Sequence, residues 1–169
     1  RLANGVFYES PAMGGFTARL SASPERSQMS PTARREGRGY SAALNYDSDT
    51  LSAMLAFERN GSGDKDSFAA AKYSFGAAAV MAAYDYSRMA ENLGRSRAIT
   101  LGATYQVGAT TFKAGYGRQR LDADTNHFYS LGADYALSRR TTLYASLGRK
   151  SYDSEKSRTA FGVGMAHAF

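Results

Sequence analysis

The sequence predicts an all-β fold: an antiparallel up-and-down transmembrane β-barrel, of which about eleven strands are present. Three observations lead to this prediction. Apolar and polar residues alternate with a period of two, as in Leu101, Ala103 and Tyr105 against Gly102 and Thr104. Between these runs, each short connection is followed by a long polar one. Aromatic residues and glycine are abundant while proline is scarce, which suits uninterrupted strands.

The composition excludes several classes of protein. Only 43% of the 169 residues are hydrophobic, and no apolar run approaches the ~18–20 residues that a spanning helix needs. A spanning strand needs only about 9–11 residues and looks hydrophilic on average, because every second residue is polar. The absence of cysteine excludes disulfides, thiol nucleophiles and thiolate metal sites. The net charge of +6 comes without a nucleic-acid-binding motif, so no nucleic-acid partner is expected.

Each predicted strand is an alternating run bounded by turn signals, and together they are expected to form a single domain over residues 1–169. The predicted strands are 3–9, 15–22, 39–46, 51–59, 67–75, 77–87, 97–107, 109–120, 126–137, 141–150 and 158–169. Short turns are expected around 47–50, 76, 108 and 138–140, and long polar loops at 23–38, 60–66, 88–96, 121–125 and 151–157. This segregation of short turns and long loops to opposite rims is typical of outer-membrane barrels.

The mid-strand charges predict which face meets lipid. A Lys or Arg on the lipid side costs about 2–4 kcal/mol near the midplane and about 0–1 kcal/mol near the interfaces. Lys113 is therefore expected to point into the lumen, while Phe112 and Ala114 face lipid. Charged residues in the middle of the other strands also fall at the positions that face the lumen. The predicted pore-lining residues are Arg19, Glu58, Lys72, Asp85, Lys113, Asp134, Lys150 and Arg158.

A few residues deviate from this division of the faces. Arg59 and Arg118 have the lipid parity, but both lie at long-loop ends, where their side chains can extend to the interface. Four large apolar residues have the lumen parity: Phe7, Phe68, Met81 and Tyr144. They are expected either to pack against an inserted loop or to mark a slip in the strand register.

The end of the chain carries a resemblance to a known family. Residues 164–169 read Gly-Met-Ala-His-Ala-Phe, a glycine-rich strand that finishes on His-x-Phe. This ending resembles that of the general trimeric porins of Gram-negative bacteria. Three further stretches, at 4–16, 101–105 and 137–141, resemble segments of the same family in the same order.

The resemblance implies a barrel of about sixteen strands, of which this chain would be the C-terminal part. About five strands would precede it, and the constriction loop would lie among them. It further implies a homotrimer in the bacterial outer membrane, in contact with membrane lipid and lipopolysaccharide. The terminal strand would be read by the barrel-assembly machinery through one face. The residues of that assembly signal would be Phe161, Val163, Met165, His167 and Phe169.

The expected function is passive diffusion of small hydrophilic solutes and ions through a water-filled channel. A basic excess in the lumen would favour weak anion selectivity, although the same charges would serve equally to solvate the wall or to pair across strands. The residues expected to filter ions are Arg19, Lys72, Lys113 and Arg158. The alternative is a non-conducting barrel whose loops carry an adhesive or structural role.

No enzyme, cofactor or metal site is predicted. His127, near Asp122 and Asp124, is the best candidate base, but neither a nucleophile motif nor zinc-ligand spacing accompanies it. The acidic pairs at 64–66 and 122–124 lack the spacing of a calcium loop. The basic loop cluster Arg34, Arg35 and Arg38 is expected either to bind lipopolysaccharide phosphates or to be a solvated loop.

Overall fold

The computed structural model describes residues 5–23, 38–90, 94–122, 124–153 and 156–168. These residues form eleven strands. The strands are β1 (Val6–Glu9), β2 (Phe16–Ser23), β3 (Gly39–Asp47), β4 (Leu51–Arg59), β5 (Lys65–Phe75), β6 (Ala78–Arg88), β7 (Arg95–Val107), β8 (Thr110–Leu121), β9 (Asp124–Ala136), β10 (Thr141–Tyr152) and β11 (Arg158–His167).

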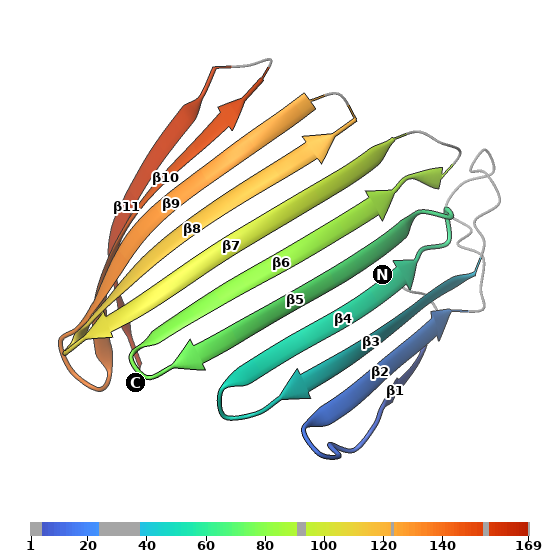
Figure 1. Cartoon of the computed structure of the whole chain (residues 1–169), viewed down its shortest axis with the longest axis horizontal. Helices are drawn as coiled ribbons and strands as arrows, with labels where there is room; N and C mark the ends of the chain where they lie inside the picture. The colour runs from blue at the N-terminus through green and yellow to red at the C-terminus, as the bar shows by residue number, and fades with distance from the viewer. Residues whose placement is uncertain (1–4, 24–37, 91–93, 123, 154–155, 169) are drawn as a thin grey trace. The chain divides into compact units, whose positions relative to one another are not determined.

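Every strand lies beside its neighbours in the chain, in the order β1 to β11, as Figure 1 shows. This up-and-down order needs only tight turns at one end of the strands. Gly76 and Gly108 begin two of these turns with φ of 62° and 56°. This left-handed conformation is unfavourable for most residues, but glycine adopts it readily because it has no Cβ. Four of the five connections at the other end are longer than these glycine turns, as expected, but β8 ends at Leu121 and β9 begins at Asp124, so the long loop expected at 121–125 is wrong.

All eleven predicted strands are confirmed, with ends that differ by at most a few residues. β1 begins at Val6, three residues later than expected, and β11 ends at His167, two residues earlier than expected. At the long-loop ends, β5, β7 and β9 begin two residues earlier and β10 ends two residues later than expected. At these ends both faces of a strand are polar, so the alternation stops although the ladder of hydrogen bonds continues.

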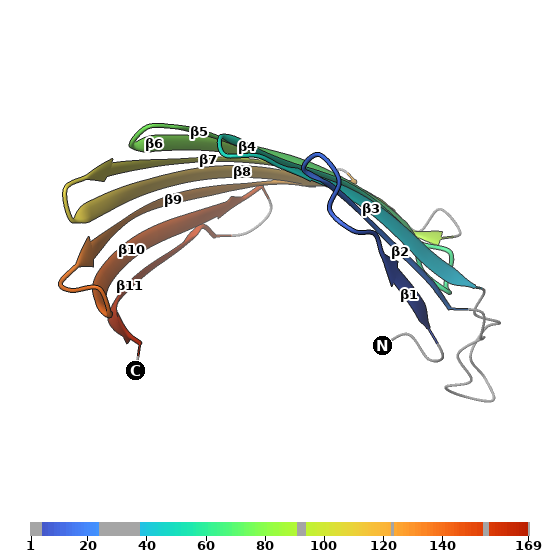
Figure 2. The same ribbon diagram turned by 90° about the horizontal axis from the view of Figure 1, so that it is seen from below.

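The strands belong to two compact units, which we describe separately. Unit 1 comprises residues 1–71 and 84–97, and unit 2 comprises residues 72–83 and 98–169. In each unit the strands form a single layer, which is visible edge-on in Figure 2.

A single layer has no interior in which to bury side chains. Among the described residues, Ala79 is the one buried hydrophobic residue and Ser23 the one buried polar residue. The large apolar side chains are instead exposed, up to 83% for Phe161. No helix in the described part of the chain has the length and apolar character that crossing a bilayer would require.

Candidate functional site

The candidate site is one face of the sheet, and the strand register defines it. Across β8 and β9, Lys113 lies opposite Gly132, while the next residue, Ala114, lies opposite Leu131. Because facing residues share a side of the sheet, the middle parts of β8 and β9 contribute Lys113 and glycine to one face and apolar residues to the other. We call these the polar face and the apolar face.

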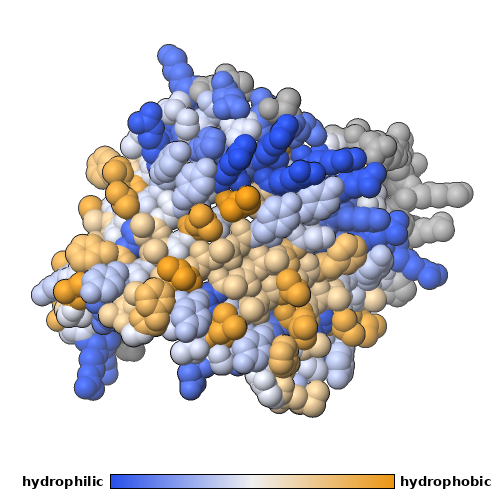
Figure 3. Space-filling model, in the orientation of Figure 1, coloured by the Kyte–Doolittle hydropathy of each residue, from blue (hydrophilic) through white to orange (hydrophobic). Residues whose placement is uncertain are grey.

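The apolar face is a continuous hydrophobic surface along the strands. In unit 2, Leu131 lies opposite Ala114 on one side and Leu147 on the other, and Leu147 lies opposite Phe161. Figure 3 shows apolar side chains gathered over the middle of the strands and hydrophilic ones toward the long connections. An exposed apolar surface of this extent requires a non-aqueous partner. Lipid is the partner that fits a band of this kind.

The polar face of unit 1 carries more acids than cations. Arg19 on β2 lies opposite Glu9 on β1, and its Nε donates to Glu9 Oε2 at 2.7 Å. Glu58 lies opposite Ser41, and Asp85 accepts a hydrogen bond of 3.1 Å from Ser87. Of the predicted pore-lining residues, this unit therefore contributes one cation, already paired, and two acids.

The polar face of unit 2 carries an excess of cations. Lys113 makes an ion pair with Asp134, the residue diagonal to it on β9. Lys150 lies directly opposite Arg158, and its Nζ sits 4.8 Å from the centre of the Tyr152 ring. A hollow of about 300 Å³ includes Lys150 in its lining, together with polar-face residues of three neighbouring strands. Lys72, on the part of β5 in this unit, adds a further exposed cation.

Glycines explain why large residues fit on the polar face. The Tyr144 ring on β10 lies over Gly164 on β11, where a Cβ would overlap it, and Met81 lies over Gly102 in the same way. The register runs through Tyr144 without a slip. Both side chains thus lie along the wall. This arrangement was not predicted from the sequence. The feature that could have predicted it is a glycine at the position that faces a large side chain on the neighbouring strand.

The two histidines lie on the apolar face and contact neutral partners. Tyr116 Oη and His127 Nδ1 are 3.1 Å apart, and the imidazole stacks on Tyr129 with ring centres 6.4 Å apart. His167 Nδ1 lies 2.9 Å from Thr141 Oγ1, a residue that faces it across the strand pair. In the described ranges, no group of three or more His, Cys, Asp or Glu residues is placed to hold a metal ion.

The expected assembly signal falls mainly on the last strand. Phe161, Val163, Met165 and His167 share the apolar face of β11. Phe169 lies outside the described residues, as do Arg34 and Arg35 of the basic loop cluster, whereas Arg38 is described and exposed.

A single-layered, up-and-down sheet with one apolar and one polar face defines a class of protein: the transmembrane β-barrels of the bacterial outer membrane. The comparisons with known proteins then identify the family within that class. The family model described as Gram-negative porin matches residues 1–155. The chain therefore belongs to the Gram-negative porin family, and it is located in the bacterial outer membrane.

Relatives and solved structures agree with this assignment. The chain is 27% identical to outer membrane porin protein 32 of Delftia acidovorans over 201 aligned positions, which cover all of the chain and 57% of the relative. It is similar to a porin structure refined at 1.8 Å resolution, with a TM-score of 0.75 and 20% identity over 96% of the chain and 60% of that structure. The Salmonella typhi OmpF structure gives a TM-score of 0.74 at 12% identity, over 96% of the chain and 61% of that structure. The chain thus spans about three fifths of the length of the proteins it matches.

Proposed function

We propose that the complete protein forms a water-filled channel through which small hydrophilic solutes and ions diffuse passively. The chain described above would supply part of the channel wall, with its polar face toward the lumen and its apolar face toward lipid. The observation that carries this proposal is the register of β8 and β9, which brings Lys113 and Asp134 together on one face and the apolar residues to the other. Membership of the porin family supports the same conclusion.

The charges on the polar face favour weak anion selectivity. Arg19 and Lys113 each have a carboxylate partner, so the field of these two ion pairs falls off quickly toward the lumen. Lys72 and Lys150 add further cations to this face. A wall with a cationic excess raises the local concentration of anions and lowers that of cations. Of the residues first expected to filter ions, Lys72 is therefore the strongest candidate, and Lys150 joins it.

We further propose that the complete protein is a homotrimer and that the barrel-assembly machinery reads the apolar face of β11. Both proposals rest on the resemblance of the chain to the trimeric porins. Cross-linking in intact outer membranes would test the first. Substitution of Phe161 and Phe169 by Ala, followed by measurement of the assembled fraction, would test the second.

Planar-bilayer recording of the full-length protein across a KCl gradient tests the proposed channel. We expect stepwise conductance increments and a reversal potential whose sign indicates a preference for chloride. Replacement of Lys72, Lys150 and Arg158 by Gln should move that potential toward cations. A folded, heat-modifiable barrel that never conducts would overturn the channel proposal and favour the adhesive or structural alternative.

A further inference from the structure

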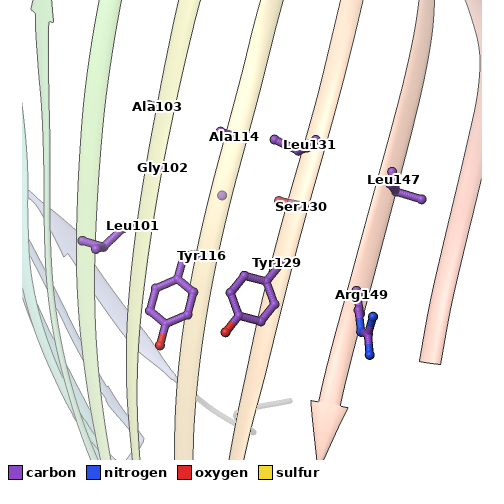
Figure 4. A pocket seen from close by; sticks show the side chains of 11 residues that line it. Leu101, Gly102, Ala103, Ala114, Tyr116, Tyr129, Ser130, Leu131, Leu147 and Arg149 are labelled. Atoms are coloured by element: carbon purple, nitrogen blue, oxygen red, sulfur yellow. The ribbon is translucent and has the colours of Figure 1, made fainter. Parts of the chain in front are cut away.

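Each face of unit 2 carries a hollow, and the two hollows differ in what lines them. The hollow drawn in Figure 4 has a volume of about 480 Å³ and opens on the apolar face between Leu101, Leu131 and Leu147. The second hollow, of about 300 Å³, takes most of its lining from the polar-face residues of β7 to β10 that belong to unit 2. In the proposed channel this second hollow meets water, so it is the one that a dissolved molecule can reach.

Phe128 on β9 places an exposed aromatic ring in the polar-face hollow. It lies opposite Gly117 on β8, where there is no side chain to cover it. A Cβ at Gly148 on β10 would lie 3.5 Å from two atoms of the Phe128 ring. The ring therefore extends over a glycine of the neighbouring strand and rests along the wall. Because 46% of the residue is exposed, the ring offers an apolar surface to the solvent on this face.

Lys150 lies opposite Phe128 on β10 and leaves the ring uncovered. The Lys150 Nζ sits 4.8 Å from the centre of the Tyr152 ring, which is the next side chain on the same face toward the long loops. This cation–π contact holds the ammonium group beside Phe128 and not over it. The hollow thus has a cationic donor at its edge and an open aromatic surface in its middle.

Two carboxamide side chains lie on the long-loop side of Phe128. Gln119 on β8 lies opposite Asn126 on β9, and both residues line the hollow. Asn126 precedes Phe128 by two residues on the same face, so their Cα atoms lie roughly 7 Å apart. Each carboxamide has a carbonyl oxygen that accepts hydrogen bonds and an amino group that donates them. Donors and acceptors therefore stand side by side at one edge of the aromatic surface.

This combination of groups matches a ring that is apolar on one side and carries hydroxyls at its rim. A hydroxyl both donates and accepts hydrogen bonds, so it uses both ends of a carboxamide, whereas an anion uses the donors alone. The C–H groups on the flat side of a sugar ring are weakly positive and pack against the negative face of an aromatic ring. None of the described residues that line the hollow is an acid, which disfavours a cationic ligand.

We propose that this hollow, which we call the Phe128 subsite, binds one ring of a neutral saccharide. The sugar would stack on Phe128, and its hydroxyls would form hydrogen bonds with Gln119, Asn126 and the Lys150 ammonium. The inference rests on the proposed channel, because it assigns a class of solute to one place on the lumen wall. A shallow site that buries one side of its ligand binds weakly, with a Kd on the order of 1–10 mM. Weak binding suits a channel, since the solute must leave as readily as it enters.

Saturation-transfer NMR of the full-length protein in deuterated detergent tests the proposal without any measurement of conductance. The probes are glucose and sorbitol, since sorbitol carries similar hydroxyls on an open chain that has no flat apolar side. We expect saturable transfer from the protein to glucose and none to sorbitol. Acetate, added as a small anion, should leave the glucose signal unchanged, because the subsite recognises a neutral ring.

Tyr144 provides a matched control, because its ring also lies over a glycine of the polar face but outside the hollow. The F128A variant should bind glucose about tenfold more weakly, through loss of the stacked ring. The F128Y variant keeps the ring and should restore binding, while Y144A should bind like the wild type. The N126A variant should lose about fivefold with one hydrogen-bonding partner. Heat-modifiable migration would verify that every variant is folded.

Four results would overturn the proposal. The first three are the absence of saturable transfer to glucose, equal transfer to sorbitol, and unchanged glucose binding by the folded F128A variant. The fourth is displacement of glucose by acetate, which would assign the hollow to anions. A protein that binds glucose but never conducts would contradict the channel proposal alone. A protein that conducts but does not bind glucose would contradict the Phe128 subsite alone, so the two failures are distinguishable.

Discussion

Arg149 and Lys150 follow one another in β10 and carry the same charge, but they lie on opposite faces of the sheet. Arg149 borders an apolar groove beside two tyrosines, while Lys150 faces Arg158 and Phe128 on the polar face. The first environment is an apolar surface of the kind that meets lipid, and the second is the polar surface on the other side of the sheet. The comparison teaches that the position of a cation along a strand decides whether it is tolerated on the lipid side. The face on which its side chain lies decides what the cation can contact.

The largest expected effect comes from placing a charge in the middle of each face. Ala145 lies on the apolar face between Ala133 and Val163, and Ser146 lies on the polar face between Gly132 and Gly162. The A145K variant should lower the free energy of unfolding by about 2–4 kcal/mol, because the ammonium enters hydrocarbon. The S146K variant should lose much less. Urea unfolding of the full-length protein in lipid vesicles measures both. Equal losses would show that the two faces have been assigned wrongly.

A smaller effect is expected where the polar face packs an aromatic ring against glycine. A Cβ at Gly164 would overlap the Tyr144 ring, whereas a Cβ at Gly162 would meet only Ser146 Oγ at 3.4 Å. The G164A variant should therefore lose about 1–3 kcal/mol of stability through overpacking, and G162A should be close to neutral. The same unfolding assay compares the pair. If Y144A suppressed none of the G164A defect, the ring would not be its cause.

Breaking an ion pair on the polar face should change selectivity more than stability. In the D134N variant, Lys113 loses its carboxylate partner and its charge is felt in the lumen. At roughly 8 Å in water a unit positive charge stabilises an anion by about 0.5 kcal/mol and destabilises a cation by as much, so the ratio of anion to cation permeability should rise about fivefold. Reversal potentials in a KCl gradient measure this ratio. The R149Q variant serves as the control, since its charge lies on the other face and should leave the ratio unchanged.

The smallest effect is expected in a loop, outside both faces. Asp64 accepts hydrogen bonds from Ala90 N at 2.7 Å and from Asn60 Nδ2 at 2.8 Å. The hydrogen bond from Ala90 contributes most and the one from Asn60 adds to it, and together they hold the pKa of the Asp64 carboxyl below its ordinary value. A depressed carboxyl pKa stabilises the folded loop above the ordinary pKa, and this contribution is lost as the pH falls through the lowered one.

Hydrogen exchange at the Ala90 amide, corrected for its intrinsic rate, should thus accelerate only at acid pH. In the D64N variant the protection of this amide should no longer depend on pH. A wild-type protein with the same protection of Ala90 at every pH would rule out this role of Asp64.

Much of the fold could be predicted from the sequence, because apolar and polar residues alternate wherever the two faces of a strand meet different surroundings. The strand Leu51–Arg59 ends at the predicted residues, since polar turn residues at 47–50 and a polar loop from Asn60 bound it on either side. The strand β10 runs on to Tyr152, beyond the predicted Lys150. In that last stretch both faces are polar, and the pattern that would reveal the strand is absent.

The candidate site was less accessible to sequence reasoning, because contacts depend on register as well as parity. Parity alone puts Lys113 and Asp134 on one face, but only the pairing of Lys113 with Gly132 shows that the two charges meet diagonally. Sequence proximity likewise suggested Asp122 and Asp124 as partners for His127. The ring reaches Tyr116 on the next strand instead.

The single-layered wall has a consequence for how this family changes over time. In a globular protein, each interior side chain must fit the shape of its neighbours. The apolar face here meets a fluid whose acyl chains conform to any surface, so many apolar residues satisfy the same position equally well. Substitutions can accumulate there without repacking, while the ladder of hydrogen bonds keeps the architecture. A TM-score of 0.74 at 12% sequence identity is the outcome expected of a protein whose hydrophobic partner is liquid.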